Sequence, residues 1–185
     1  MDNGADDSAG SGVAAGATRE ANLDAADHRH LRHALALALR SRAQGRHPFG
    51  ALVVSRDGAV LAEAENNSLP PAGDPTQHAE LRAAQLAARA AGVDGLAGAT
   101  LYSSAEPCAM CAGAIYWCGI GRVVYALSEA RLLALTGDHP ENPTFALPCR
   151  AVFARGQRQV AVVGPALEDE AAQAHLGFWQ RGAAA

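Results

Sequence analysis

The sequence predicts an α/β fold, a three-layer α/β/α sandwich around a central five-stranded mixed sheet. Short runs of β-type residues alternate with longer segments of helical periodicity, which is typical of a sheet covered by helices on both faces. Asp57-Gly58 separates the first two runs and predicts a tight hairpin, so one pair of strands is antiparallel. Helical segments separate the later runs, which predicts right-handed crossovers between parallel strands.

The first half of the chain predicts one helix before the hairpin and a loop after it. Leucines recur at every fourth position within 24–44, and Gly45 ends this helix. The hairpin strands are predicted over 51–55 and 59–62. Residues 66–76 are polar and contain three prolines and a glycine, which indicates a loop.

The second half predicts a regular alternation of helices and strands. Gly92 and Gly119 each follow a segment of helical periodicity, and each is predicted to end a helix. The pattern predicts helices over 77–91, 109–119, 128–135 and 168–180, a helical turn over 151–155, and strands over 100–103, 122–126 and 160–163. Residues 136–148 form a proline-bearing loop, and its length indicates a function.

Charge and composition exclude several kinds of chemistry. All fifteen basic residues are arginine, so a Walker-type phosphate loop, a Schiff-base lysine and a lysine general base are excluded. The formal net charge is −4 and the arginines form no stripe. Binding of long nucleic acid usually depends on a concentrated basic patch, so this balance favours a small neutral or weakly basic ligand.

The sequence predicts one folded domain over 23–182. Residues 1–22 are mostly Gly, Ala, Ser and Asp, which predicts a disordered N-terminal tail. The acidic start differs from a secretory signal, and no apolar run approaches the roughly 18 residues of a membrane span, so a cytoplasmic location is expected.

Three residues have the spacing of a metal site. Cys108 and Cys111 are separated by two residues at a predicted helix start, and His78 lies at another helix start. Zinc with three protein ligands keeps one position open, which is the catalytic arrangement. An alternative is a thiol redox pair made of the two cysteines alone, which predicts no metal.

Glu80 lies two residues after His78, on the first turn of the same predicted helix. There it would lie near the metal without binding it, in position to move protons as a general acid and base. A purely structural zinc site in a binding module would not require this carboxylate.

The spacing His-x-Glu followed by Pro-Cys-x-x-Cys is the signature of the zinc deaminases of the cytidine deaminase superfamily. The resemblance extends over roughly 31–126 and is greatest to bacterial guanine deaminases. It is carried by the segments 47–54, 65–67, 74–80 and 106–117. The resemblance implies a cytidine deaminase-like fold, one Zn²⁺ per chain held by His78, Cys108 and Cys111, catalysis by Glu80, and a homodimer.

The same resemblance implies which residues bind substrate. Asn66 would bind the edge of the base beside the backbone of Ala79, while Phe49 and Trp117 would line the pocket. Guanine deaminases also carry acidic residues after the last shared strand, for which Asp138 and Glu141 are candidates here. In that family the C-terminal segment closes over the site of a partner subunit, a role for which Phe178 and Trp179 are candidates.

The resemblance leaves the substrate open. Guanine, converted to xanthine and ammonia, is the first expectation, and other aminopurines, cytosine-like bases and nucleosides are alternatives. Bacterial tRNA adenosine deaminases share the segments 106–115 and 121–125. Three features favour a free base instead: Phe49 after Pro48, the Asn66-Asn67 and Tyr116-Trp117 pairs, and the lack of a positive field for tRNA.

Overall fold

The computed structural model describes residues 23–180 of the chain. In chain order the elements are α2 (Ala25–Ala43), β1 (Gly50–Val54), β2 (Val60–Glu65), α3 (Ala79–Ala91), the 3₁₀ turn η1 (Asp94–Leu96), β3 (Thr100–Ala105), α4 (Ala109–Trp117), β4 (Arg122–Leu127), α5 (Glu129–Thr136), α6 (Cys149–Phe153), β5 (Ala161–Val163) and α7 (Glu168–Ala172). The predicted disordered tail, 1–22, lies outside the described residues.

The sheet has the order β2-β1-β3-β4-β5. β1 pairs antiparallel with β2 and β3, whereas β3, β4 and β5 are parallel. The predicted mixed sheet of five strands is therefore confirmed, with the hairpin at one edge. The parallel strands place the C-terminal ends of β3 and β4 side by side, and in open α/β sheets this is the edge where ligands bind.

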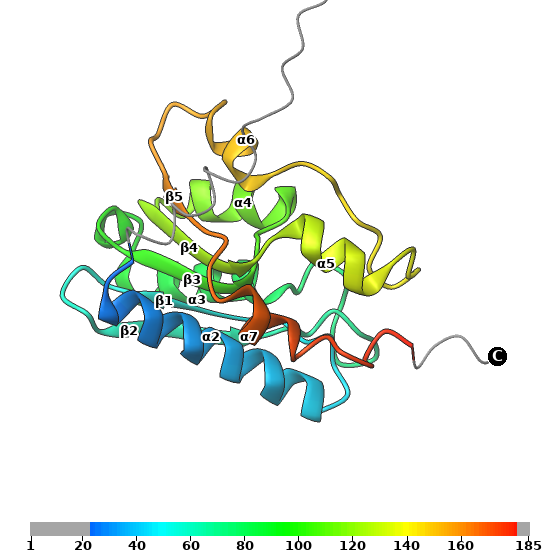
Figure 1. Cartoon of the computed structure of the whole chain (residues 1–185). Helices are drawn as coiled ribbons and strands as arrows, with labels where there is room; N and C mark the ends of the chain where they lie inside the picture. The colour runs from blue at the N-terminus through cyan, green and yellow to red at the C-terminus, as the bar shows by residue number, and fades with distance from the viewer. Residues whose placement is uncertain (1–22, 181–185) are drawn as a thin grey trace, which may run out of the picture.

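Helices cover both faces of the sheet, which confirms the three-layer sandwich. Figure 1 shows α2 and α7 on one side and α4 and α6 on the other. A cluster of buried side chains joins α3, α4 and α6 to one face, and a second joins α2, α5 and α7 to the opposite face. Alanines 79, 83, 84 and 87 of α3 are fully buried, so small side chains let α3 pack closely on the sheet.

Gly50 shows how closely the other layer packs. A β-carbon added to Gly50 at the start of β1 would lie 2.5 Å from the Leu37 Cβ and 2.6 Å from the Ala34 carbonyl oxygen of α2. No other amino acid fits this position without moving the helix.

The C-terminal helix is shorter than the sequence predicted. α7 ends at Ala172 instead of continuing to Gln180, and a series of turns follows. Gly177 has a positive φ of 68°, which an α-helix does not accommodate. Within residues 23–180, no helix is long and apolar enough to cross a membrane.

Candidate active site and metal centre

Two helix N-termini bring together the three predicted metal ligands. His78 is the N-cap of α3, Cys108 is the N-cap of α4, and Cys111 lies in the first turn of α4. Their ligand atoms all lie within 4.8 Å of one another, and the Cys108 Sγ is 3.7 Å from the His78 Nδ1. One imidazole and two thiols around a common point fit a zinc ion.

The two thiols differ in their acidity. A hydrogen bond from the Cys111 thiol lowers the pKa of Cys108 to about 4, and His78 acts in the same direction. The pKa of Cys111 is raised well above its usual value because its thiol gives that hydrogen bond and is buried. The pair therefore already carries one negative charge at neutral pH, which suits a cation.

Glu80 lies next to this group on the first turn of α3 and is buried. Burial raises the pKa of its carboxyl above the usual value. The hydroxyl of Ser103 on β3 donates to the Glu80 Oε1 at 3.0 Å, and the Cys111 Sγ lies 3.6 Å from Oε2. A carboxyl with a raised pKa beside a metal group is suited to taking up and releasing protons.

A cavity of about 670 Å³ opens over the metal group. His78, Cys108 and Glu80 line it together with three further glutamates, Glu106, Glu129 and Glu141. Among the described residues that line this cavity there is no arginine. The cavity is therefore acidic, and it suits a ligand that presents N–H groups.

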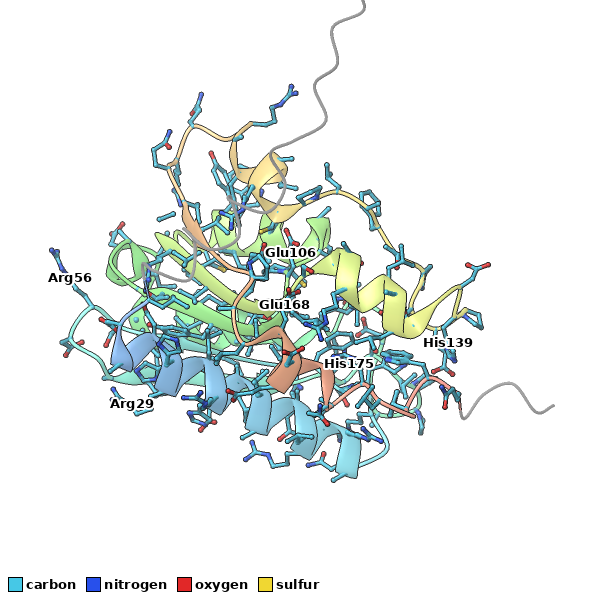
Figure 2. The ribbon with its side chains drawn as sticks, viewed as in Figure 1. Arg29, Arg56, Glu106, His139, Glu168 and His175 are labelled. Carbon is cyan, nitrogen blue, oxygen red and sulfur yellow. The ribbon has the colours of Figure 1, made fainter. Side chains whose placement is uncertain are left out.

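Two of these glutamates differ in their surroundings. Burial, followed by the charges of Cys108 and Glu106, raises the pKa of Glu129 to about 7. The carboxylate of Glu106, labelled in Figure 2, accepts from the backbone N–H groups of Cys149 at 3.1 Å and Glu129 at 3.4 Å. Glu106 therefore joins the starts of α5 and α6, while Glu129 lines the cavity.

The structure brings some of the predicted substrate residues to the cavity and leaves others outside it. Asn66, Phe49 and Glu141 line it. Ala79 lies between two lining residues, but its side chain is in the core. Asp138 is exposed and is not a lining residue.

Trp117 does not line the cavity of its own chain. Its side chain is 75% exposed at the C-terminal end of α4, whereas the cavity lies at the N-terminal end of that helix. Ile115 is buried in the last turn of α4. Trp117 follows two positions later and therefore lies on the opposite, outward side of the helix.

The C-terminal segment packs on its own chain. The Trp179 ring is stacked on His175 and lies 5.1 Å from the ring of His47, centroid to centroid. Phe178 is half-buried against the same His47, at 6.1 Å. Neither aromatic residue lines the cavity directly; both lie behind residues that do.

Four residues of the site were missed from the sequence. They are His47, Ser68, Ser103 and Glu129. Glu129 could have been found, because it follows the C-terminal end of a parallel strand, where ligand-binding residues are common. Ser103 and Ser68 carry no sequence signal, since their roles depend on contacts with distant segments.

The comparisons with known proteins agree with this geometry. Residues 24–127, more than half of the chain, match the family model described as the cytidine and deoxycytidylate deaminase zinc-binding region. The chain belongs to this family. It is accordingly a zinc-type deaminase, a hydrolase acting on C–N bonds, with a His-Cys-Cys group positioned for the metal.

Individual relatives act on different bases. A probable cytosine deaminase of Schizosaccharomyces pombe is 41% identical over 160 residues, 86% of this chain and 96% of that protein. A guanine deaminase of Bacillus subtilis is 48% identical over 79 residues, 43% of this chain and 49% of that protein. The solved guanine deaminase of Nitrosomonas europaea has a TM-score of 0.68 at 28% identity, covering 85% of this chain and 86% of that one.

Proposed function

We propose that the chain deaminates a free nucleobase, with guanine as the first candidate. The reaction replaces a ring amino group by a carbonyl oxygen from water and releases ammonia. For guanine the products are xanthine and ammonia.

The acidity of the cavity is the observation that carries this proposal. Four glutamates and no arginine line it among the described residues, which suits an uncharged base with N–H groups. A tRNA substrate would bring phosphates to the mouth of the site and would need basic side chains there. A tRNA adenosine deaminase is therefore the weaker candidate.

The residues of the metal group have separate roles in this proposal. His78, Cys108 and Cys111 would hold zinc, which when bound supplies a Lewis acid that activates water. Glu80 accepts a proton from the attacking water and later delivers it to the departing amine nitrogen, so one carboxyl serves as base and then as acid. Its burial supports this exchange, because a raised pKa keeps both protonation states accessible.

The remaining contacts orient the base. Asn66 is buried at the cavity wall and its amide can bind one edge of the ring. Phe49 supplies an apolar surface for the face of the ring, and Glu141 accepts an N–H at the outer end of the cavity. Dimerisation and a cytoplasmic location stay predictions.

Cytosine is the second candidate base. The relative from Schizosaccharomyces pombe, a probable cytosine deaminase, aligns over most of both chains, whereas the Bacillus subtilis guanine deaminase aligns over about half of its own length. The cavity volume of about 670 Å³ favours the bicyclic base, since a single ring would leave more of it to water.

An ammonia-release assay tests the proposal directly. Purified protein with a measured zinc content is incubated with guanine, cytosine, adenine and their nucleosides, and ammonia and the deaminated product are quantified. We expect ammonia and xanthine from guanine. Inosine formation in an RNA hairpin, without ammonia from any free base, would overturn the proposal.

A further inference from the structure

A chain of hydrogen bonds lies along one wall of the cavity. The His47 Nε2 is 3.0 Å from the Glu141 Oε2, and the His47 Nδ1 is 3.1 Å from the Ser68 Oγ. The Ser68 Oγ is in turn 2.7 Å from the Asn66 Oδ1. We call these four residues the His47 relay; all of them line the cavity.

The direction of these hydrogen bonds follows from the backbone. The Ser68 backbone N–H lies 2.8 Å from the Asn66 Oδ1, and because an N–H can only donate, this atom is the amide oxygen. The Ser68 hydroxyl lies 2.7 Å from the same oxygen and 3.1 Å from the His47 Nδ1, so it links the imidazole ring to the amide oxygen. The opposite ring nitrogen, Nε2, faces the Glu141 carboxyl.

This arrangement fixes which side of the Asn66 amide meets the ligand. Its oxygen accepts from the Ser68 backbone N–H and contacts the Ser68 hydroxyl, and within residues 23–180 its Nδ2 meets no hydrogen-bond acceptor. The NH₂ group is therefore available to the cavity as a donor.

The His47 ring is itself held firmly. It is 5% exposed, its backbone carbonyl accepts from the Ser41 hydroxyl at 2.7 Å, and the rings of Phe178 and Trp179 pack against it. A ring fixed on several sides can determine the rotamer of its hydrogen-bond partner.

We propose that His47 is a positioning residue that, anchored by Glu141, acts through Ser68 to hold Asn66 as a hydrogen-bond donor to the substrate. This inference depends on the proposed function, in which Asn66 contacts the base. It also narrows the substrate class: the edge of the heterocycle facing Asn66 carries an acceptor, either a carbonyl oxygen or an unprotonated ring nitrogen.

A double-mutant cycle tests the inference with the base that releases ammonia. We expect His47→Gln to lower kcat/KM about tenfold, mostly through KM, because the amide contact forms with bound substrate as well as in the transition state. In the Asn66→Ala background the same change should cost less than about twofold, because the group that His47 positions is gone.

Three further variants complete the test, and the first of them is a control. His33 forms a comparable contact with Glu63 at 2.8 Å, but on the exposed surface of α2 and β2, so His33→Gln should leave kcat and KM unchanged. Ser68→Ala interrupts the relay without changing His47. If His47→Gln does not fold, Ser68→Ala takes its place in the double-mutant cycle with Asn66→Ala. Ser68→Thr keeps the hydroxyl and should restore the KM.

The outcomes separate the inference from the proposed function. If the wild-type protein releases ammonia from none of the bases, the proposed function fails and the inference fails with it. If the wild type is active but the losses from His47→Gln or Ser68→Ala are equal in both backgrounds, only the positioning role is overturned. A loss that falls entirely on kcat would also contradict it.

Discussion

Glu80 combines two conditions that are unfavourable for a carboxylate: it is buried, and it lies beside a thiol pair that carries negative charge. Its partner at Oε1 is the neutral hydroxyl of Ser103, not a cation. Such surroundings keep the proton affinity of the carboxyl high, which is useful to a group that must both accept and release a proton.

At this residue we expect Glu80→Gln to keep the fold and the bound zinc while lowering kcat by at least about a thousandfold, because an amide occupies the same volume but does not transfer the proton. Elemental analysis checks that the variant keeps its zinc, and an ammonia-release assay checks the loss of kcat. Unchanged turnover with full zinc would contradict the role of Glu80.

Ser103 allows a second test with a neighbouring control. Removing its hydroxyl by Ser103→Ala should lower kcat about tenfold, which corresponds to a hydrogen bond of about 1.4 kcal/mol. Ser104 is equally buried on β3, but its hydroxyl accepts from the Gly50 N–H at 3.0 Å on the opposite side. Ser104→Ala should therefore reduce thermal stability and leave kcat unchanged; equal losses of kcat would contradict the role of Ser103.

Sequence reasoning at the residue scale succeeded where short-range spacing determines position. His78, Cys108 and Cys111 lie at helix starts, so a local pattern was enough to predict that they meet. Trp117 lies outside the cavity of its own chain, and the resemblance carries no information on which way the end of α4 faces. The His47 relay spans 94 residues from His47 to Glu141, and no local pattern encodes such a contact.

At the scale of elements, α2 is attached to the sheet by an ion pair whose carboxylate is buried and whose guanidinium is partly exposed. Asp27 accepts from two guanidinium nitrogens of Arg122 on β4, at 2.7 and 2.8 Å, and from the Tyr102 hydroxyl of β3 at 2.7 Å. Burial alone would raise the pKa of Asp27, but these hydrogen bonds and the charge of Arg122 outweigh it and hold the pKa below its usual value.

The sign of the resulting pH dependence follows from the lowered pKa. The stabilisation from Asp27 is present above its unfolded pKa of about 3.9 and is lost as the pH falls through the lower folded value. We expect the free energy of unfolding of the wild type to decline below about pH 4 more steeply than that of Asp27→Asn. At neutral pH the variant should be about 3 kcal/mol less stable, since it leaves Arg122 without its charged partner.

Urea unfolding between pH 3 and pH 7 checks this expectation. Glu170→Gln is the control, because Glu170 pairs with Arg32 where both side chains are about half exposed, at 47% and 55%, and little change is expected there. Parallel curves for wild type and Asp27→Asn would contradict the role given to the ion pair.

Element boundaries were predicted best where a glycine directly follows the last residue of a helical pattern, as Gly92 does after α3. The end of α7 was predicted too late in the chain: Gly177 lies inside the predicted helix with a positive φ, and the Trp179 and His175 rings pack against His47 and Phe49. Tertiary packing overrides local propensity in that segment.

At the scale of the whole molecule, the fold class was predictable because helices and strands alternate along the chain, and few sheet topologies are compatible with that alternation. A hairpin at one edge and crossovers between the remaining strands nearly determine the observed strand order. The cavity was not predictable in this way, since it depends on how the loop after α5 lies over the sheet edge.

The exposed end of α4 leads to an expectation about assembly. Trp117 is 75% exposed and Met110, at the other end of α4, is 38% exposed. Large exposed apolar groups of this kind are common at protein interfaces. We expect the wild type to sediment as a dimer and Trp117→Arg to shift it toward monomer, with Leu39→Arg on α2 as the control. A wild-type monomer, or an unaffected Trp117→Arg dimer, would contradict this expectation.

The double hydrogen bond of Glu106 has a consequence for how substrate range changes. The loop over 137–148, which carries Glu141, begins and ends at helices that one carboxylate holds together. The carboxylate fixes the point where the loop returns, at the start of α6, while the loop leaves from Thr136 at the far end of α5. Loop sequences from other deaminases that keep a glutamate in contact with His47 should therefore be exchangeable between α5 and α6 without unfolding the sheet, so base selectivity can change while the metal group stays intact.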